Sequence, residues 1–263
     1  MKIAKKYFLI TLTFILAVTL TACNMVNTSN PETILSKTIE NTKNIKSGES
    51  STTTIAEMVT DNSTPKSETK IVSTFTTDPE VYKISGTVSS DNVSDKNYKE
   101  EIYLKDNTAY VKKSTSSDWT KSSNSTVTSQ YDHLKENIFP QKVLEAYKKN
   151  AQDFKVSEEN GNYVLTYSGT DKEKFKEIII SILNSSKNSD DQNDTYNDID
   201  PKELQIKYVV TKDFTPVSSE SKFSFSANNL TFIGTINTTY SKINAVNEVN
   251  LPDETKNAVE VTG

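Results

Sequence analysis

The side chains that could carry out chemistry in this 263-residue sequence are few and lie far apart. The sequence contains one cysteine, Cys23, and one histidine, His133. A nucleophilic serine or cysteine needs a neighbouring base and a group that orients it, and nothing near His133 in the sequence suggests either. Structural zinc requires a cluster of cysteines and histidines, and a lone cysteine forms no internal disulfide. The sequence therefore predicts a protein that is not an enzyme and has no catalytic residue, metal site or cofactor.

Cys23 lies at the end of the longest apolar stretch of the chain. Three lysines among the first six residues form a positive head, residues 7–22 are mostly apolar or small, and Thr21 and Ala22 directly precede the cysteine. This order of charged, apolar and small residues is typical of a secretory signal. Residues 7–22 are too few for a helix that crosses a bilayer, which needs about 20 residues.

The segment Leu20-Thr21-Ala22-Cys23 resembles the bacterial lipobox, in which a diacylglyceryl group is joined to the cysteine sulfur before the signal is removed. The resemblance implies a cleaved lipoprotein signal peptide (residues 1–22), lipid attachment at Cys23 and a polar tether (residues 23–30). Two acyl chains on one residue give stable anchoring. We therefore expect a lipid-anchored protein on the extracytoplasmic face of the cell membrane, with residues 31–263 as its domain. The alternative is an ordinary cleaved signal with an unpaired cysteine.

The charge of the chain argues against nucleic acid as a partner. The formal net charge is −5, and removal of residues 1–22, which hold three lysines and no acidic residue, makes it more negative. Proteins that bind nucleic acid need a basic surface. All the basic residues are lysines except for His133, and Asn, Ser and Thr are abundant, which favours an AT-rich coding bias and a low-GC Gram-positive host.

The first half of the chain predicts a helix followed by a meander. Asn30 is a capping residue, Pro31 suits the first helical position, and Gly48 suits a left-handed stop. From Glu49 to Lys113 apolar residues recur with a period of two, which is typical of antiparallel strands with one covered and one solvated face. We expect Ser, Thr and Lys on the solvated face.

The second half predicts two helices around a hairpin and then a second meander. A short helix is expected near residues 143–150, Asn160-Gly161 is a type I′ hairpin signal, and residues 170–173 read as a capping box before an amphipathic helix. Alternation resumes after residue 204. Gly234 leaves a gap in the inner row of side chains, which indicates a bend, a bulge or a close approach by another group.

Two further segments invite a binding interpretation. Trp119, the only tryptophan, either stacks on a ligand or packs in the core, and packing is the usual fate of such residues. The acidic segment 189–200 contains several oxygen ligands suited to calcium. It lacks the glycine and the terminal glutamate of an EF-hand loop, so we interpret it as a solvated loop.

The order of elements, the lipobox and the closing segment Leu251-Pro252-Asp253-Glu254 resemble Gram-positive lipoproteins of the LolA/LppX-like superfamily, mostly uncharacterised, over nearly the whole mature chain. The resemblance implies an α+β fold, in which a strongly curved antiparallel sheet forms an open half-barrel with helices packed on its concave side. Better-known relatives carry acyl chains between sheet and helices. An anchored protein cannot shuttle lipid as the soluble carrier LolA does, but it can receive, present or sense it.

Two functional hypotheses follow. In the first, a lipid or other hydrophobic ligand lies between the sheet and the apolar stripe of the amphipathic helix, formed by Phe175, Ile178, Ile179, Ile182 and Leu183. In the second, the core is solid, and a cell-surface interaction or scaffold lipoprotein presents its polar face to a protein or to the cell wall. The sequence does not separate a filled core from a cavity, and it identifies no protein partner.

Overall fold

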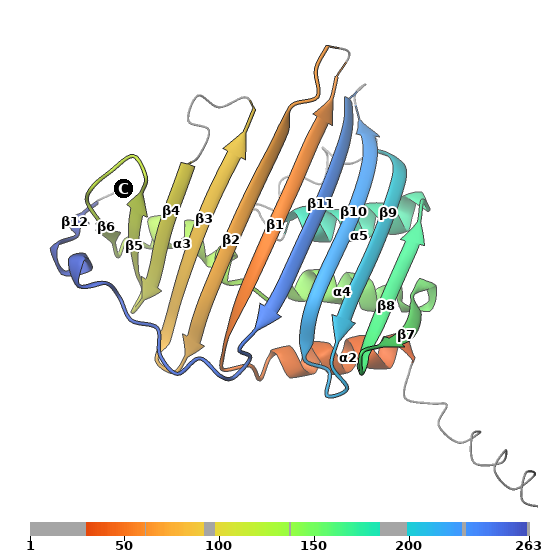
Figure 1. Ribbon diagram of the computed structural model, residues 1–263, viewed down its shortest axis with the longest axis horizontal. Coiled ribbons are helices and arrows are strands. Elements are labelled where there is room, and N and C mark those ends of the chain that lie inside the picture. The colour runs from red at the N-terminus through yellow and green to blue at the C-terminus, as the bar shows by residue number, and fades with distance from the viewer. Residues whose placement is uncertain are drawn as a thin grey trace, which may run out of the picture.

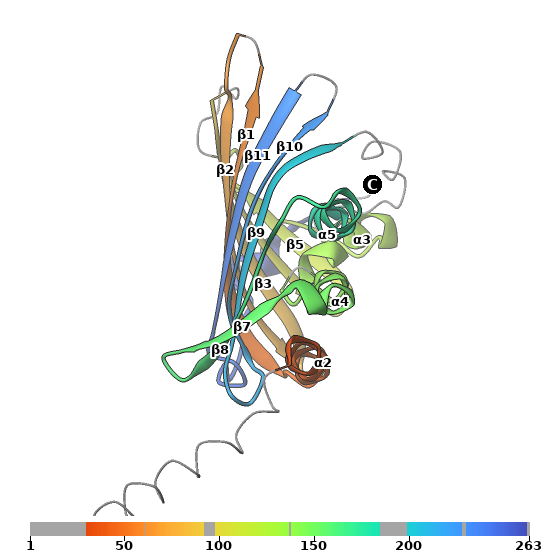
Figure 2. The same ribbon diagram turned by 90° about the vertical axis from the view of Figure 1, so that its right-hand side faces the viewer.

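The structure, a computed structural model, describes residues 30–60, 62–91, 98–136, 138–184, 199–227 and 230–261. Within these residues, twelve strands form one open and mostly antiparallel sheet. Four α-helices lie on a single face of the sheet, which curves around them (Figures 1 and 2). The predicted fold class, an open curved sheet with helices on its concave side, is confirmed.

The helices all cover the concave face. They are α2 (Pro31–Thr42), α3 (Ser125–Glu136), α4 (Gln141–Lys149) and α5 (Lys172–Asn184). The strands, in chain order, are β1 (Ser47–Val59), β2 (Lys66–Thr77), β3 (Glu80–Ser90), β4 (Tyr98–Lys105), β5 (Thr108–Lys113), β6 (Thr120–Ser122), β7 (Lys155–Glu159), β8 (Asn162–Gly169), β9 (Asp200–Val210), β10 (Pro216–Ala227), β11 (Leu230–Ser241) and β12 (Val259–Glu260).

Two meanders joined side by side make up the sheet. Strands β1 to β6 follow one another in space as they do in the chain, and so do strands β7 to β11. The two meanders meet where β1 pairs with β11, and we call this junction the seam. Its register places Thr52 opposite Thr238 and Ala56 opposite Gly234.

Local signals explain where the best-defined helices begin. The Asn30 side chain accepts a hydrogen bond from the Glu32 amide at 3.0 Å, so the predicted cap of α2 is confirmed. The predicted stop at Gly48 is wrong, because α2 ends at Thr42 and Gly48 already lies in β1. The capping residue of α5 is Asp171, whose side chain accepts a hydrogen bond from the Lys174 amide at 3.1 Å. The predicted capping box begins one residue earlier, at Thr170.

Both special backbone sites predicted in the second half are confirmed. Asn160 and Gly161 have φ values of 51° and 78° and connect β7 to β8, as a type I′ turn requires. Gly234 faces Phe223 across the β10–β11 pair, and a Cβ at Gly234 would lie 2.2 Å from the Phe223 Cζ atom. A close approach by an aromatic ring therefore explains this glycine.

Each half of the sheet has its own apolar core on the concave face. Helices α2, α4 and α5 pack on β8, β9 and β10 around side chains such as Leu35, Tyr147 and Leu204. Helix α3 lies over β3, β4 and β5, whose core includes Ile84 and Ile102. The seam runs between these two cores.

A third cluster lies on the opposite face, where the C-terminal segment packs. After β11 the chain follows the lower end of the sheet, coloured blue in Figure 1, and Val259 and Glu260 then pair in parallel with β6. Val249 and Ala258 of this segment pack with Trp119 and Tyr103, whose rings are 5.8 Å apart. Trp119 is 5% exposed and is therefore a core residue, as the packing interpretation expects.

Candidate functional site

The concave face changes character at the seam. Across β8 to β10 and across β3 to β5 the inward side chains are mainly apolar and closely packed. On β1, between these regions, the inward positions carry Ser50, Thr52 and Thr54. Short polar side chains fill less space than the leucines and isoleucines on either side, and they leave room beneath the helices.

A cavity of about 140 Å³ occupies this space. It lies between the central strands β2, β1, β11 and β10 and the helices α3, α4 and α5. Its lining residues come from strands, helices and the α3–α4 connection: Ser50, Thr52, Thr54, Ile71, Ser73, Leu134, Ile138, Pro140, Val143, Tyr147, Ile182, Ser219, Ser221, Ile236, Thr238 and Tyr240.

The roof of the cavity is apolar. Leu134 comes from α3, Ile138 and Pro140 from the connection between α3 and α4, and Val143 and Ile182 from α4 and α5. Such side chains gain free energy by removing the apolar part of a ligand from water. The roof can therefore hold an aliphatic or aromatic group.

The floor of the cavity carries hydroxyl groups. The register aligns Thr52 with Thr238 across the seam, and Thr238 with Ser219 on β10. The hydroxyls of Thr52 and Thr238 are 3.0 Å apart and hydrogen-bond to each other. One row further along, Ser50 lies opposite Ser73.

Three of these hydroxyls have no side-chain hydrogen-bond partner among the described residues. Ser50 and Ser73 are 6% and 3% exposed, and Thr54 also lines the cavity. Among the described residues, no group forms a side-chain hydrogen bond with the hydroxyls of Ser50, Thr54 or Ser73. Among the described residues, the fully buried side-chain N and O atoms without a partner include Gln141 Oε1 but none of these three hydroxyls, so a molecule in the cavity can reach and bond to them.

Buried tyrosines complete one side of the cavity, where burial opposes a negative charge on their phenol oxygens. Burial raises the pKa of Tyr147 to about 12, and the hydroxyl of this residue is 3.3 Å from the Ser221 hydroxyl. Burial also raises the pKa of Tyr240 and that of Tyr208, whose ring lies against Tyr147. These phenols stay protonated and neutral at physiological pH, so each can donate a hydrogen bond.

The five ligand-contact residues predicted on α5 are distributed unequally. Phe175, Ile178 and Ile179 are fully buried in the core between α2, α4, α5 and the sheet. Leu183 packs partly buried against the same core, and Ile182 is the member that lines the cavity. A ligand in the cavity would therefore contact Ile182 but not the other four residues of the predicted stripe.

The floor was not predicted as a site. Ser50 alternates with Ser51, and Thr52 with Thr53, so both faces of β1 are polar and the hydrophobic pattern does not indicate which face turns inward. The prediction that serine and threonine residues lie on the solvated face is wrong for Ser50, Thr52 and Thr54. The apolar partners on neighbouring strands set the inward face, and that information lies outside β1.

Comparison with known proteins identifies the family. Residues 30–260 match a family of unknown function, DUF6612. The chain belongs to the DUF6612 family. No curated protein matches the chain.

Two solved structures are similar to this DUF6612 protein at low TM-scores. One is a beta-barrel-like protein of the domain of unknown function DUF1849 from Brucella abortus, with 8% identity, a TM-score of 0.22 and coverage of 74% of this chain and 99% of the other. The second is a DUF1329 family protein from Desulfovibrio piger, with 11% identity, a TM-score of 0.27 and coverage of 86% and 97%.

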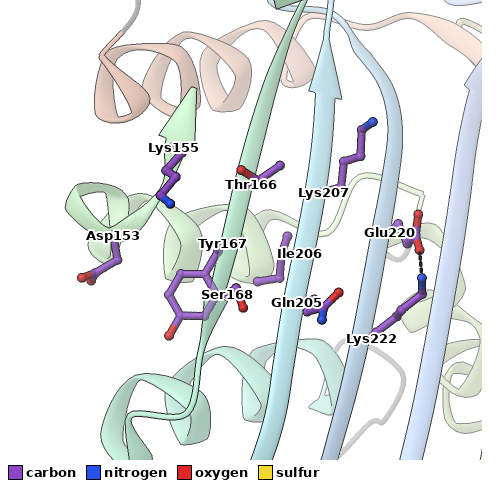
Figure 3. A pocket seen from close by; sticks show the side chains of 10 residues that line it. All are labelled: Asp153, Lys155, Thr166, Tyr167, Ser168, Gln205, Ile206, Lys207, Glu220 and Lys222. Atoms are coloured by element: carbon purple, nitrogen blue, oxygen red, sulfur yellow. Dashed lines mark ion pairs between the residues drawn. The ribbon is translucent and has the colours of Figure 1, made fainter. Parts of the chain in front are cut away.

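A larger hollow lies on the opposite face of this DUF6612 protein, over β8, β9 and β10 (Figure 3). Three lysines line it, and two of them are paired with acidic side chains: Lys222 with Glu220 at 2.6 Å and Lys207 with Glu159 at 2.9 Å. Paired surface charges bind an anion poorly, because it must compete with the existing partner. The cavity at the seam is the better candidate site.

Other predictions concern residues that the structure describes only in part. Cys23, the signal segment and most of the acidic segment 189–200 lie outside the described residues, and so does the side chain of His133 in α3. Among the described residues, no group of three His, Cys, Asp or Glu side chains is placed to hold a metal ion. No helix in the described segments is long and apolar enough to cross a membrane.

Proposed function

We propose that this protein is a membrane-anchored, extracytoplasmic lipoprotein without enzymatic activity that binds a lipid or other hydrophobic ligand between its curved sheet and its helices. The observation that carries the proposal is the cavity at the seam, with its apolar roof and with hydroxyls that have no side-chain partner among the described residues. Its partners are the membrane, through Cys23, and the ligand. Nucleic acid and cofactors have no part in this function.

The anchor is supported by the order of charged, apolar and small residues that ends at Cys23. Helix α2 begins at Pro31, eight positions after Cys23 in the sequence. Such a short polar tether holds the domain close to the membrane surface, where hydrophobic ligands are found.

The size of the cavity limits how tightly a group that lies inside it can bind. A dry engineered cavity of about 150 Å³ binds benzene, so a cavity of about 140 Å³ accepts an apolar group of about six carbons. At about 0.8 kcal/mol per buried methylene, this group contributes roughly 5 kcal/mol, which corresponds to a Kd of a few tenths of a millimolar. A ligand that binds more tightly must also contact surface outside the cavity.

Native mass spectrometry of the chain from Asn24 onward, which contains every described element, tests ligand binding. We expect a retained mass that organic extraction identifies as an apolar molecule. Thr54→Phe places a ring in the cavity and should remove that mass, whereas Thr53→Phe, on the opposite face of β1, should keep it. A bare wild-type protein with a cooperative, ligand-independent melt would contradict ligand binding and favour the interaction or scaffold hypothesis.

Labelling with palmitate tests the anchor separately. In a Gram-positive host, the full chain should incorporate label and fractionate with membranes, whereas Cys23→Ala should lose both properties because the thioether cannot form. Incorporation of label by Cys23→Ala would show that the anchor has been assigned to the wrong residue.

A further inference from the structure

The floor of the cavity is more polar than a site for a pure hydrocarbon requires. Seven serine and threonine residues from β1, β2, β10 and β11 line it: Ser50, Thr52, Thr54, Ser73, Ser219, Ser221 and Thr238. Among its described lining residues there is no lysine, aspartate, glutamate or histidine. A polar but uncharged floor beneath an apolar roof restricts the chemistry of an occupant.

We infer that the ligand places an uncharged hydrogen-bonding group, such as a hydroxyl or an ester carbonyl, on the hydroxyls of Ser50 and Ser73, with its apolar part against the helices. The ligand class is therefore a neutral amphiphile, such as a fatty alcohol or an acylglycerol. Free fatty acids and plain hydrocarbons are excluded from this class. The inference rests on the proposed function and specifies the ligand of the same site.

A hydrocarbon is disfavoured because it would cover hydroxyls without bonding to them. Ser50 and Ser73 are buried, lie directly opposite each other, and have no side-chain hydrogen-bond partner among the described residues. Filling the cavity with apolar atoms would displace water from both hydroxyls and leave them unsatisfied. A ligand hydroxyl or carbonyl would replace the bonds to water instead.

A carboxylate is disfavoured because the described part of the site offers no positive charge. The raised pKa of Tyr147 reports that this environment opposes a negative charge on the phenol, even with the Ser221 hydroxyl 3.3 Å away. A ligand carboxylate would face the same desolvation next to the same kind of donors. Neutral phenols and hydroxyls suit a neutral head group.

Strand pairing brings two hydroxyls of the floor together. Ser50 and Ser73 lie opposite each other on β1 and β2, at the α3 side of the seam, and line the same cavity as the roof residues Leu134 and Ile138. A ligand in this position lies with its polar edge on the sheet and its apolar edge on the helices. This arrangement makes Ser50 and Ser73 determinants of ligand specificity.

Three ring-sized probes distinguish these chemistries: benzyl alcohol, toluene and benzoate. Each probe has one ring and one further carbon, so the apolar part is matched. We would titrate each at neutral pH into the chain from Asn24 onward and follow protein resonances by NMR. In the wild type, benzoate should bind at least tenfold more weakly than benzyl alcohol.

The decisive variant is Ser50→Ala combined with Ser73→Ala. It should raise the Kd of benzyl alcohol about tenfold, which is the expected effect of losing one or two hydrogen bonds. The Kd of toluene should stay unchanged or fall. The matched control is Ser51→Ala combined with Thr74→Ala on the other face of the same strands, which should change neither Kd. Thr52→Val with Thr238→Val keeps the floor shape while removing a pair of mutually bonded hydroxyls, and it should have a smaller effect.

The outcomes separate the inference from the proposed function. If toluene binds and benzyl alcohol is insensitive to the Ser50 and Ser73 substitutions, the neutral-head inference is wrong while hydrophobic binding stands. Equal binding of benzoate and benzyl alcohol to the wild type would overturn it as well. If no probe binds and the purified protein carries no lipid, the proposed function fails together with the inference.

Discussion

Substitution of Gly234 by alanine adds only a methyl group but should strongly destabilise the protein. Gly234 lies on β11 and is fixed by pairing to Ala56 on one side and to Phe223 on the other. An added Cβ would lie 2.2–2.7 Å from three atoms of the Phe223 ring, well inside ordinary van der Waals contact. The ring would have to move by about 1 Å.

The size of the effect follows from the surroundings of the ring. Phe223 is 7% exposed and stacks near Phe225, so its ring has little free space to enter. Overpacking a filled core costs about 1–3 kcal/mol, and we expect the upper end here because paired strands hold the backbone on both sides. For a domain of this size, about 3 kcal/mol lowers Tm by roughly 6–12 °C.

The control is the same substitution at another strand glycine. Gly86 on β3 has no atom within 4 Å of an added Cβ, so Gly86→Ala should be neutral or stabilise slightly. Phe223→Leu combined with Gly234→Ala should cost less than the sum of the single changes, because the shorter side chain gives way. Equal Tm values for the two alanine variants, or strict additivity with Phe223→Leu, would refute the steric explanation.

Two further predictions concern buried aromatic residues. The pKa of Tyr147 is raised to about 12 in the fold from about 10 unfolded, so the stability it contributes is complete below pH 10 and is lost as the pH rises towards 12. In Tyr147→Phe, the free energy of unfolding should fall by roughly 3 kcal/mol less between pH 9 and pH 12 than in the wild type, as measured by denaturant unfolding. An equal fall in the two proteins would contradict the burial of the phenol. Trp119→Ala should cost about 3–5 kcal/mol and expose residues 246–258 to limited proteolysis, because it removes the ring against which Val249 and Ala258 pack; an unchanged cleavage pattern would show that the C-terminal segment is held elsewhere.

The sequence predicts the sheet and most helices because their signals are local. Each of three signals is made of residues that are close together in the sequence: the Asn30 cap, the Asn160-Gly161 turn and the apolar stripe of α5. All three are present in the structure. The glycine at position 234 was recognised from a missing side chain in an alternating row. The identity of its neighbour, Phe223, depends on strand pairing.

The site could be predicted only in part, because it depends on contacts between distant segments. The amphipathic helix was expected to face a ligand along its whole stripe. The packing of α5 against α2, α4 and the sheet encloses Phe175, Ile178 and Ile179, and it leaves Ile182 at the cavity. The hydroxyl floor combines β1 with β11, and alternation within a single strand carries no information about that pairing.

The seam also has a consequence for how the protein reaches its folded state. Thr52 and Thr238, which bond across it, are 186 residues apart in the chain. The strands within each meander pair with sequence neighbours and can form early, but β1 keeps an open edge until β11 is available. When the N-terminal part of the chain is available first, the floor of the cavity is therefore completed late, after β11 has formed. Until then the unpaired edge of β1 can pair with other chains, so a slow or interrupted folding reaction would lead to aggregation there.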